Sequence, residues 1–199
     1  MTTLLEPTSE LEAVNIMLSN IGESPVNSLE NEQVVDAGIA RTILASVNRE
    51  VQSHGYWFNT DIDRTFLPNT HHRIVLPPNV LRVDTSGKDL HTKNYVHRGK
   101  YLYDANNHTF RIRKPVVLTV VVGLGFDEIP ECARRYITLR AARAFQERII
   151  GAPSVSQFNE KDELGARAAL IAEDAAARDH NMLHDSVTVM RTLNRRNYF

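Results

Sequence analysis

A stretch from Ile129 to Pro153 predicts one helix with both ends marked in the sequence. Pro130 suits the first helical position, where its missing N–H removes no hydrogen bond. Gly151 followed by Pro153 is a stop signal for the helix. Between these ends an alanine-rich segment carries five arginines, which must meet carboxylates, phosphate or water: Arg134, Arg135, Arg140, Arg143 and Arg148.

These five arginines form no stripe, because at about 100° per residue they spread around the helix axis. Ala133, Ile137 and Phe145 lie on one side, and Tyr136 and Leu139 lie on the other. A helix with two apolar sides belongs between neighbours rather than on a free surface. The arginines could cover core edges within one molecule, contact neighbouring protein subunits, or face DNA. The near-neutral charge of the chain favours protein carboxylates over phosphate.

Two further helices precede this segment. Ser9 with Glu12 fits a capping box, and Gly22 ends the helix that Ser9 begins. A second helix is predicted from about Glu32 to His54, with Gly55 at its end.

A fourth helix is predicted from about Ser154 to Asp179, with Ser154 and Gln157 in a second capping box. Its acidic residues are plausible partners for the arginines of the preceding helix. Helical spacing predicts one apolar stripe on this helix: Leu164, Ala168, Ile171 and Ala175.

The segment from Tyr56 to Phe126 has a different character, with short runs rich in β-branched and aromatic residues that prolines, glycines and asparagines interrupt. Tyr95 to Tyr101 predicts a hairpin that turns near Arg98-Gly99. The strands should be antiparallel, because the segment offers no helix for a parallel crossover.

The predicted fold class is therefore α+β. Residues 1–55 and 128–180 should form one helical bundle domain, because neither the N-terminal nor the C-terminal helix pair has enough apolar surface for a core of its own. Residues 56–127 should form an inserted antiparallel β subdomain, and residues 181–199 a C-terminal tail. That tail is basic through Arg191, Arg195 and Arg196, and is predicted either to be disordered or to order against a partner.

Composition excludes several classes of protein. A formal net charge of −1 argues against a general nucleic-acid binder. No run of about 18 apolar residues suggests a membrane span, and the N-terminus has no pattern of a signal peptide. Cys132 is the only cysteine, so no intrachain disulfide can form, as suits a reducing cytosolic assembly site.

Motifs for catalysis or metal binding are weak. The eight histidines lack the paired spacing of a zinc site, and no phosphate loop or nucleophile elbow is present. We therefore expect no catalytic residue, metal or cofactor. The alternative is a hydrolase of surface polysaccharide that uses a carboxylate pair. Its candidate residues are Asp61 with Asp63, and Asp127 with Glu128 and Glu131.

Three segments resemble the tail tubular proteins A of T7-like podoviruses, in the same order and at similar spacing. They are residues 11–29, 41–59 and 128–153, followed by Asn181-Met182-Leu183. The most specific piece is the end of the first helix, Ile21-Gly22-Glu23-Ser24-Pro25-Val26.

This resemblance implies a structural virion protein, a head-to-tail adaptor assembled in the host cytoplasm. Family members form a ring of about twelve copies below the portal protein, with the nozzle protein beneath, tail fibres nearby and DNA passing through without sequence-specific contact. The five helix arginines are then candidates for subunit contacts, and the three arginines of the tail for portal docking. Because ring closure can depend on the portal as a template, the isolated chain is expected to be a monomer.

Overall fold

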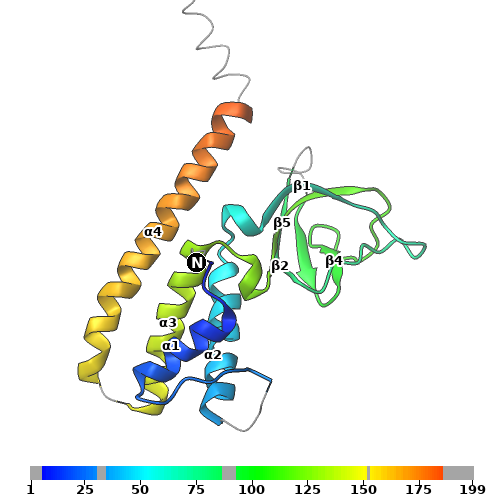
Figure 1. Ribbon diagram of the computed structural model, residues 1–199. Helices are drawn as coiled ribbons and strands as arrows, with labels where there is room; N and C mark the ends of the chain where they lie inside the picture. The colour runs from blue at the N-terminus through cyan, green and yellow to red at the C-terminus, as the bar shows by residue number, and fades with distance from the viewer. Residues whose placement is uncertain (1–5, 31–34, 87–92, 152, 186–199) are drawn as a thin grey trace, which may run out of the picture. The chain divides into compact units, whose positions relative to one another are not determined.

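The computed structural model describes residues 6–30, 35–86, 93–151 and 153–185, and the side chains of the last helix between residues 160 and 178. Helices and antiparallel strands are both present, so the predicted α+β class is confirmed (Figure 1). The chain divides into two compact units, the first made of residues 1–44 and 130–199 and the second of residues 45–129.

The first unit is helical. It contains α1 (Glu10–Asn20), the beginning of α2 (Val35–Gln52), α3 (Glu131–Ile149) and α4 (Pro153–Asp185). The helix α3 packs against both α1 and α4. Its interior consists of small and aliphatic side chains around Phe145, which is fully buried. The predicted arginine helix is confirmed, although Pro130 is its N-cap residue and Glu131 its first helical residue.

The first helix has the predicted caps at both ends. The Ser9 hydroxyl accepts a hydrogen bond from the Glu12 N–H at 3.2 Å. At the other end Gly22 adopts a φ of +83°, and the N–H of Glu23 donates to the Leu18 carbonyl at 3.0 Å. This is a Schellman motif, whose left-handed position favours glycine. The Asn15 amide then pairs with both backbone groups of Val26, at 2.8 and 3.0 Å, and so holds the following loop against α1.

The second unit contains two sheets. One has three antiparallel strands in the order β1–β5–β2, with bounds Thr60–Phe66, Val116–Val122 and Val80–Thr85. The other is the predicted hairpin of β3 (Tyr95–Arg98) and β4 (Tyr101–Asp104). One core joins the two sheets, and Ile74, Leu102, Leu118 and Val120 at its centre are fully buried.

Glycine at the hairpin turn explains its tight geometry. Gly99 has a φ of +60° at the first position of a two-residue loop, as a type II′ turn requires. Residues 73–76 add a further extended segment beside β4, since Val75 bridges to Tyr101 and the Leu102 N–H donates to the Ile74 carbonyl at 3.0 Å.

A network of buried amides lies where the chain enters and leaves the second unit. Gln52 and Asn59 are each 1% exposed. The Gln52 side chain donates to the Leu124 carbonyl and accepts from the Leu124 N–H, both at 2.9 Å. The Asn59 amide donates to the carbonyls of Gln52 and Val122, again at 2.9 Å. Two side chains thus join the end of α2 to the segment that follows β5.

The edge strand β1 is irregular. Its register with β5 shifts between Asp61 and Arg64, and Asp63 within this bulge has a φ of +55°. Five successive residues of the strand, 61–65, are exposed. A bulge of this kind bends a strand and disrupts its ladder of backbone groups.

A substitution at Gly55 tests the packing between the end of α2 and the first sheet. It has a φ of +78°, and a Cβ there would lie 2.8 Å from Val121 Cγ2. We expect Gly55→Ala to lower the free energy of unfolding by about 2 kcal/mol, because both the backbone and the packing are violated. Urea unfolding followed by the fluorescence of Trp57, the single tryptophan, measures the change in the second unit.

The matched control is Gly38→Ala in α2, where a Cβ meets nothing within 4 Å. That change should be neutral or stabilise by up to about 1 kcal/mol, because alanine favours helix. Equal urea midpoints for the two variants would contradict the interpretation of Gly55.

Candidate functional site

The arginine helix α3 is surrounded on most of its circumference. Tyr136, Ile137, Ala141 and Ala142 are at most 3% exposed, although they point in quite different directions around the axis. Helices α1 and α4 supply contacts along its length. We expected α3 to lie between neighbouring elements because it has two apolar sides. Helices α1 and α4 of the same chain are in part those neighbours.

Arg134 holds the N-terminal segment against α3. Its Nη1 donates to the Thr8 carbonyl at 2.8 Å. The Glu131 carboxylate accepts from both the Thr8 N–H, at 2.7 Å, and the Thr8 hydroxyl, at 2.8 Å. Arg134 and Glu131 therefore bind Thr8 through its carbonyl, its N–H and its hydroxyl.

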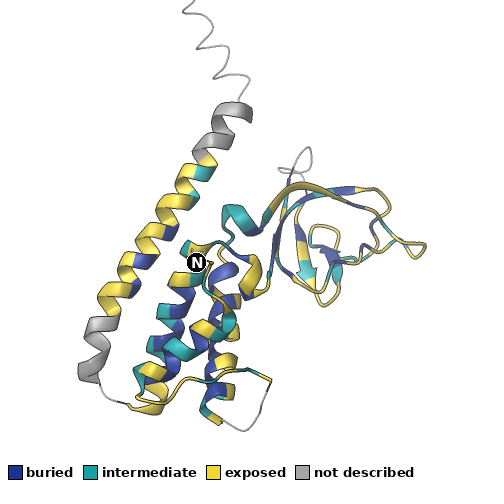
Figure 2. Ribbon diagram, viewed as in Figure 1, coloured by how far each residue is buried: buried dark blue, intermediate teal, exposed yellow. Residues whose placement is uncertain are grey.

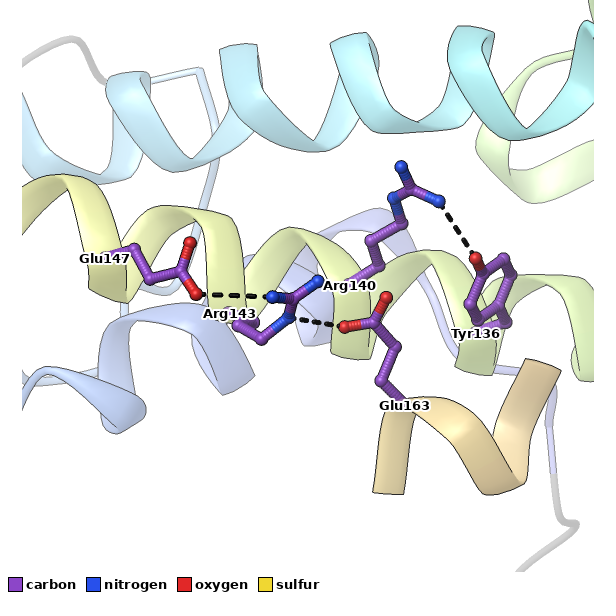
Figure 3. A network of polar contacts seen from close by, with 5 residues as sticks. All are labelled: Tyr136, Arg140, Arg143, Glu147 and Glu163. Atoms are coloured by element: carbon purple, nitrogen blue, oxygen red, sulfur yellow. Dashed lines mark hydrogen bonds and ion pairs between the residues drawn. The ribbon is translucent and has the colours of Figure 1, made fainter. Parts of the chain in front are cut away.

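Arg143 links α3 to α4 (Figure 3). Its Nε lies 2.6 Å from Oε2 of Glu163, whose residue is 9% exposed, and its Nη1 lies 3.3 Å from Oε1 of Glu147. Hydrogen bonding to Glu163 raises the pKa of Arg143 above its ordinary value, so the guanidinium stays charged. One turn away, Arg140 donates to the Tyr136 hydroxyl at 2.9 Å. The structure thus engages Arg134, Arg140 and Arg143 within the chain.

The two other arginines of α3 are exposed. Among the described residues, neither Arg135 nor Arg148 has a carboxylate within ion-pair distance. Arg135 borders a groove of about 230 Å³ between α3 and α4, together with Lys161 and Asp162. These two guanidinium groups remain available to a partner outside the chain.

The face of α4 that contacts α3 is not the apolar stripe predicted from its sequence. Leu164 and Ile171 of the predicted apolar stripe are 56% and 50% exposed, and Ala168 and Ala175 are exposed as well (Figure 2). The residues that face α3 are Glu163, Ala166 and Leu170. The Arg143–Glu163 ion pair joins the two helices on this face, beside the small Ala166 and the fully buried Leu170. The predicted apolar stripe is thus not the face that contacts α3, and the described residues leave it uncovered.

The basic residues of the tail, Arg191, Arg195 and Arg196, lie outside the described residues, so their predicted role in portal docking stays a prediction.

Three carboxylates of the hydrolase alternative make structural contacts that are described here: Asp61, Glu128 and Glu131. Asp61 pairs with Arg64 at 2.8 Å. Glu128 accepts from the Gly125 N–H at 2.7 Å, and Glu131 accepts from Thr8 as described above. Asp63 lies in the exposed bulge of β1. These contacts give the alternative no support.

Within the described ranges, no three His, Cys, Asp or Glu side chains are grouped so that they could bind a metal ion. No helix in the same ranges has the length and hydropathy of a membrane span.

One feature escaped the reasoning from sequence. The hairpin and residues 73–75 bring Arg73, Arg98, Tyr101 and Tyr103 onto one outward face, where the Arg98 guanidinium lies 3.8 Å from the Tyr103 ring. The alternation of Val96 with Arg98, and of Tyr101 with Tyr103, was the available signal.

The sequence matches known proteins over most of its length. Residues 11–180 match the sequence profile of the family described as Tube, tail tubular protein. The chain is 35% identical over 128 residues to tail tubular protein A of Klebsiella phage KP34. This alignment covers 64% of the chain and 66% of the relative, which is just under two thirds of the relative's length.

The Arg143–Glu163 pair gives a test of how α4 is held. We expect Arg143→Met to lower the free energy of unfolding by about 1 to 3 kcal/mol, because it leaves the Glu163 carboxylate buried without a partner. Arg143→Met/Glu163→Met should recover part of this loss. Urea unfolding followed by circular dichroism measures both changes.

Arg148→Met serves as the control, because an exposed arginine should change stability by less than about 0.5 kcal/mol. If Arg143→Met were as stable as Arg148→Met, the ion pair would have no role in positioning α4.

Cys132 should be an inert thiol. Burial, a hydrogen bond to Glu173 and the charge of that carboxylate raise its pKa from 9.0 to about 12. At pH 8 its reaction with a disulfide reagent such as Ellman's reagent should be roughly a thousandfold slower than that of an ordinary thiol. Glu173→Gln should speed the reaction by removing the negative charge, whereas Glu160→Gln should not. Rates equal to those of a free peptide would contradict the raised pKa.

Proposed function

Because the chain belongs to the tail tubular protein family and is a structural component of a phage tail, we propose that it forms the head-to-tail adaptor ring of its virion. In this proposal its copies, twelve in number by the family resemblance, close a ring between the portal protein and the tail nozzle. Tail fibres attach nearby, and DNA passes through the central channel without sequence-specific contact.

The uncovered apolar face of α4 carries the proposal. Leu164 and Ile171 are 56% and 50% exposed. Ala168 and Ala175 lie on the same side of the helix and add only small side chains to it. Contiguous exposed apolar side chains on a soluble protein favour contact with another protein. Burying them would stabilise a contact by roughly 25 cal/mol for each Å² removed from water. In a ring this gain recurs at every subunit boundary.

The arginines of α3 divide into two roles in this proposal. Arg135 and Arg148 contact the neighbouring copy directly, since they are exposed and have no carboxylate partner in the described chain. Arg134, Arg140 and Arg143 hold α3 and its neighbours in the shape that the contact needs. A closed ring is heterologous, so each copy must present two different surfaces. The face of α4 is one of them.

The remaining expectations complete the proposal. The helix pairs of residues 1–55 and 128–180 form one bundle that builds the wall of the ring. The inserted β subdomain, residues 56–127, meets the nozzle or the fibres. Residues 181–199, with Arg191, Arg195 and Arg196, dock on the portal. The isolated chain is a monomer until the portal acts as a template for closure.

Charge substitution on α4 tests the ring. We expect Leu164→Asp/Ile171→Asp to reduce ring formation on purified portal at least about tenfold, because carboxylates would be buried at every boundary. Electron micrographs of the mixture count the rings. The fold should be unchanged, since both positions are exposed, and circular dichroism checks this.

The matched control is Ile62→Asp/Leu67→Asp, because both of these side chains are 70% exposed on the β subdomain. This variant should form rings at the level of the natural protein. Normal rings from the α4 variant would reject α4 as the contact, and no ring from any version of the protein, with portal present, would reject the adaptor itself.

A further inference from the structure

Aromatic rings, valines and cations lie together on the outward face of the hairpin sheet. Directly opposed residues of an antiparallel pair lie on the same face, so Val96 with Tyr103 and Arg98 with Tyr101 share one side. Val75 joins them through its bridge to Tyr101. We call this the hairpin outer face, and define it by six residues: Arg73, Val75, Val96, Arg98, Tyr101 and Tyr103.

The inner side of the same hairpin belongs to the core. Ile74 and Leu102 are completely buried, and Tyr95 is 7% exposed. The outer side, in contrast, leaves Val75 50% and Val96 38% exposed. The described residues of the second unit therefore leave the two valines of the outer face uncovered, whereas Tyr103 is 8% exposed beneath Arg98 and beside Phe110.

The cations of this face lie over the tyrosine rings. The Arg98 guanidinium lies 3.8 Å from the centre of the Tyr103 ring, and Arg73 lies 5.4 Å from that of Tyr101. The Phe110 ring meets Tyr103 edge-on at 4.9 Å and supports it from the side. A stacked guanidinium keeps its N–H edge free and pre-oriented for a carboxylate or phosphate.

The chain supplies no carboxylate for these cations within the described residues. Arg73 and Arg98 have no ion pair there, and neither does Lys100 at the turn. From Lys93 to Lys114 the sequence holds six Lys and Arg residues but a single acidic residue, Asp104. Asp104 is 5% exposed, and its carboxylate accepts hydrogen bonds from the backbone of Asn106 and from Asn107. The face is locally basic although the whole chain carries a charge of −1.

We propose that the hairpin outer face binds an acidic protein surface, carboxylates around an apolar centre, on a different protein of the tail. Tyrosine and arginine around a desolvated apolar centre are the residues that dominate binding energy between proteins. DNA is the weaker fit, because the ring faces are already covered by cations and exposed valines contribute nothing to a phosphate backbone.

A second copy of the chain is also the weaker fit. Several carboxylates of the helical unit are already engaged within it, namely Glu10 with Arg41, Glu131 with Thr8, Glu163 with Arg143 and Asp174 with Arg178. The proposal rests on the proposed function, since it deepens the role given there to the β subdomain.

The experiment compares phage particles that carry Arg73→Glu/Arg98→Glu with particles that carry Arg49→Glu/Arg64→Glu. The second pair changes charge equally at exposed positions of the same unit, on α2 and β1, outside the six residues of the face. Quantitative mass spectrometry of purified particles measures every tail protein, and micrographs record whether the ring is present. We expect the first variant to keep its ring and to lose one other tail protein at least about tenfold, with the control unchanged.

Suppressors identify the partner. Infectivity of the first variant should return when an acidic residue of the lost protein becomes Lys or Arg. Circular dichroism shows whether the variant chain folds, and if it does not, Arg73→Gln/Arg98→Gln takes its place, with a smaller expected loss.

Three results would overturn the proposal. Tail proteins all retained at natural levels would show that the face binds none of them. Loss of the ring itself, or suppressors only within this chain, would make the face a contact between copies. Binding of a 30-base-pair duplex by the natural chain but not by the variant would make it a DNA surface. Absence of a ring from natural particles would instead reject the adaptor function, which keeps the two failures apart.

Discussion

The second unit depends on two buried amides, Gln52 and Asn59. Each backbone group that they pair lies where a helix or strand has ended, and among these groups the Gln52 carbonyl also accepts from the Gly55 N–H. A buried polar group without a hydrogen bond costs about 1 to 3 kcal/mol. Loss of the two amides would apply that cost to more than one backbone group. The amides therefore decide where α2 stops and where the chain may leave β5. Gly55 allows the approach, because no side chain fits between it and Val121.

Charge in the helical unit follows a comparable logic. Three arginines of α3 meet a carbonyl, a hydroxyl or carboxylates inside the chain, which removes the cost of holding cations beside a packed core. The Arg143–Glu163 pair lies on the buried side of α4, together with Ala166 and Leu170. Leucine and isoleucine face outward on another side of the same helix.

Local signals in the sequence predicted the helices and strands well. They did not predict which face of a helix packs against a distant element. Ser9 and Gly22 mark the ends of α1 because caps act through backbone groups a few residues away. Gly99 marks the hairpin for the same reason. The rotation of α4 was missed, because helical spacing shows that Leu164 and Ile171 share a face but not which element covers it. The hairpin outer face was missed since Arg73 joins it from another segment.

The bulge in β1 has a consequence for a protein that is built into a phage tail. An edge strand offers unpaired N–H and carbonyl groups to any similar strand, and crowding in an assembly raises the chance of such an encounter. The left-handed Asp63 and the shifted register interrupt that row of groups, and charged Asp61 and Arg64 flank the interruption. Open-ended strand stacking into fibrils is thereby blocked at this edge, so association is directed to surfaces where side chains, rather than backbone, choose the partner.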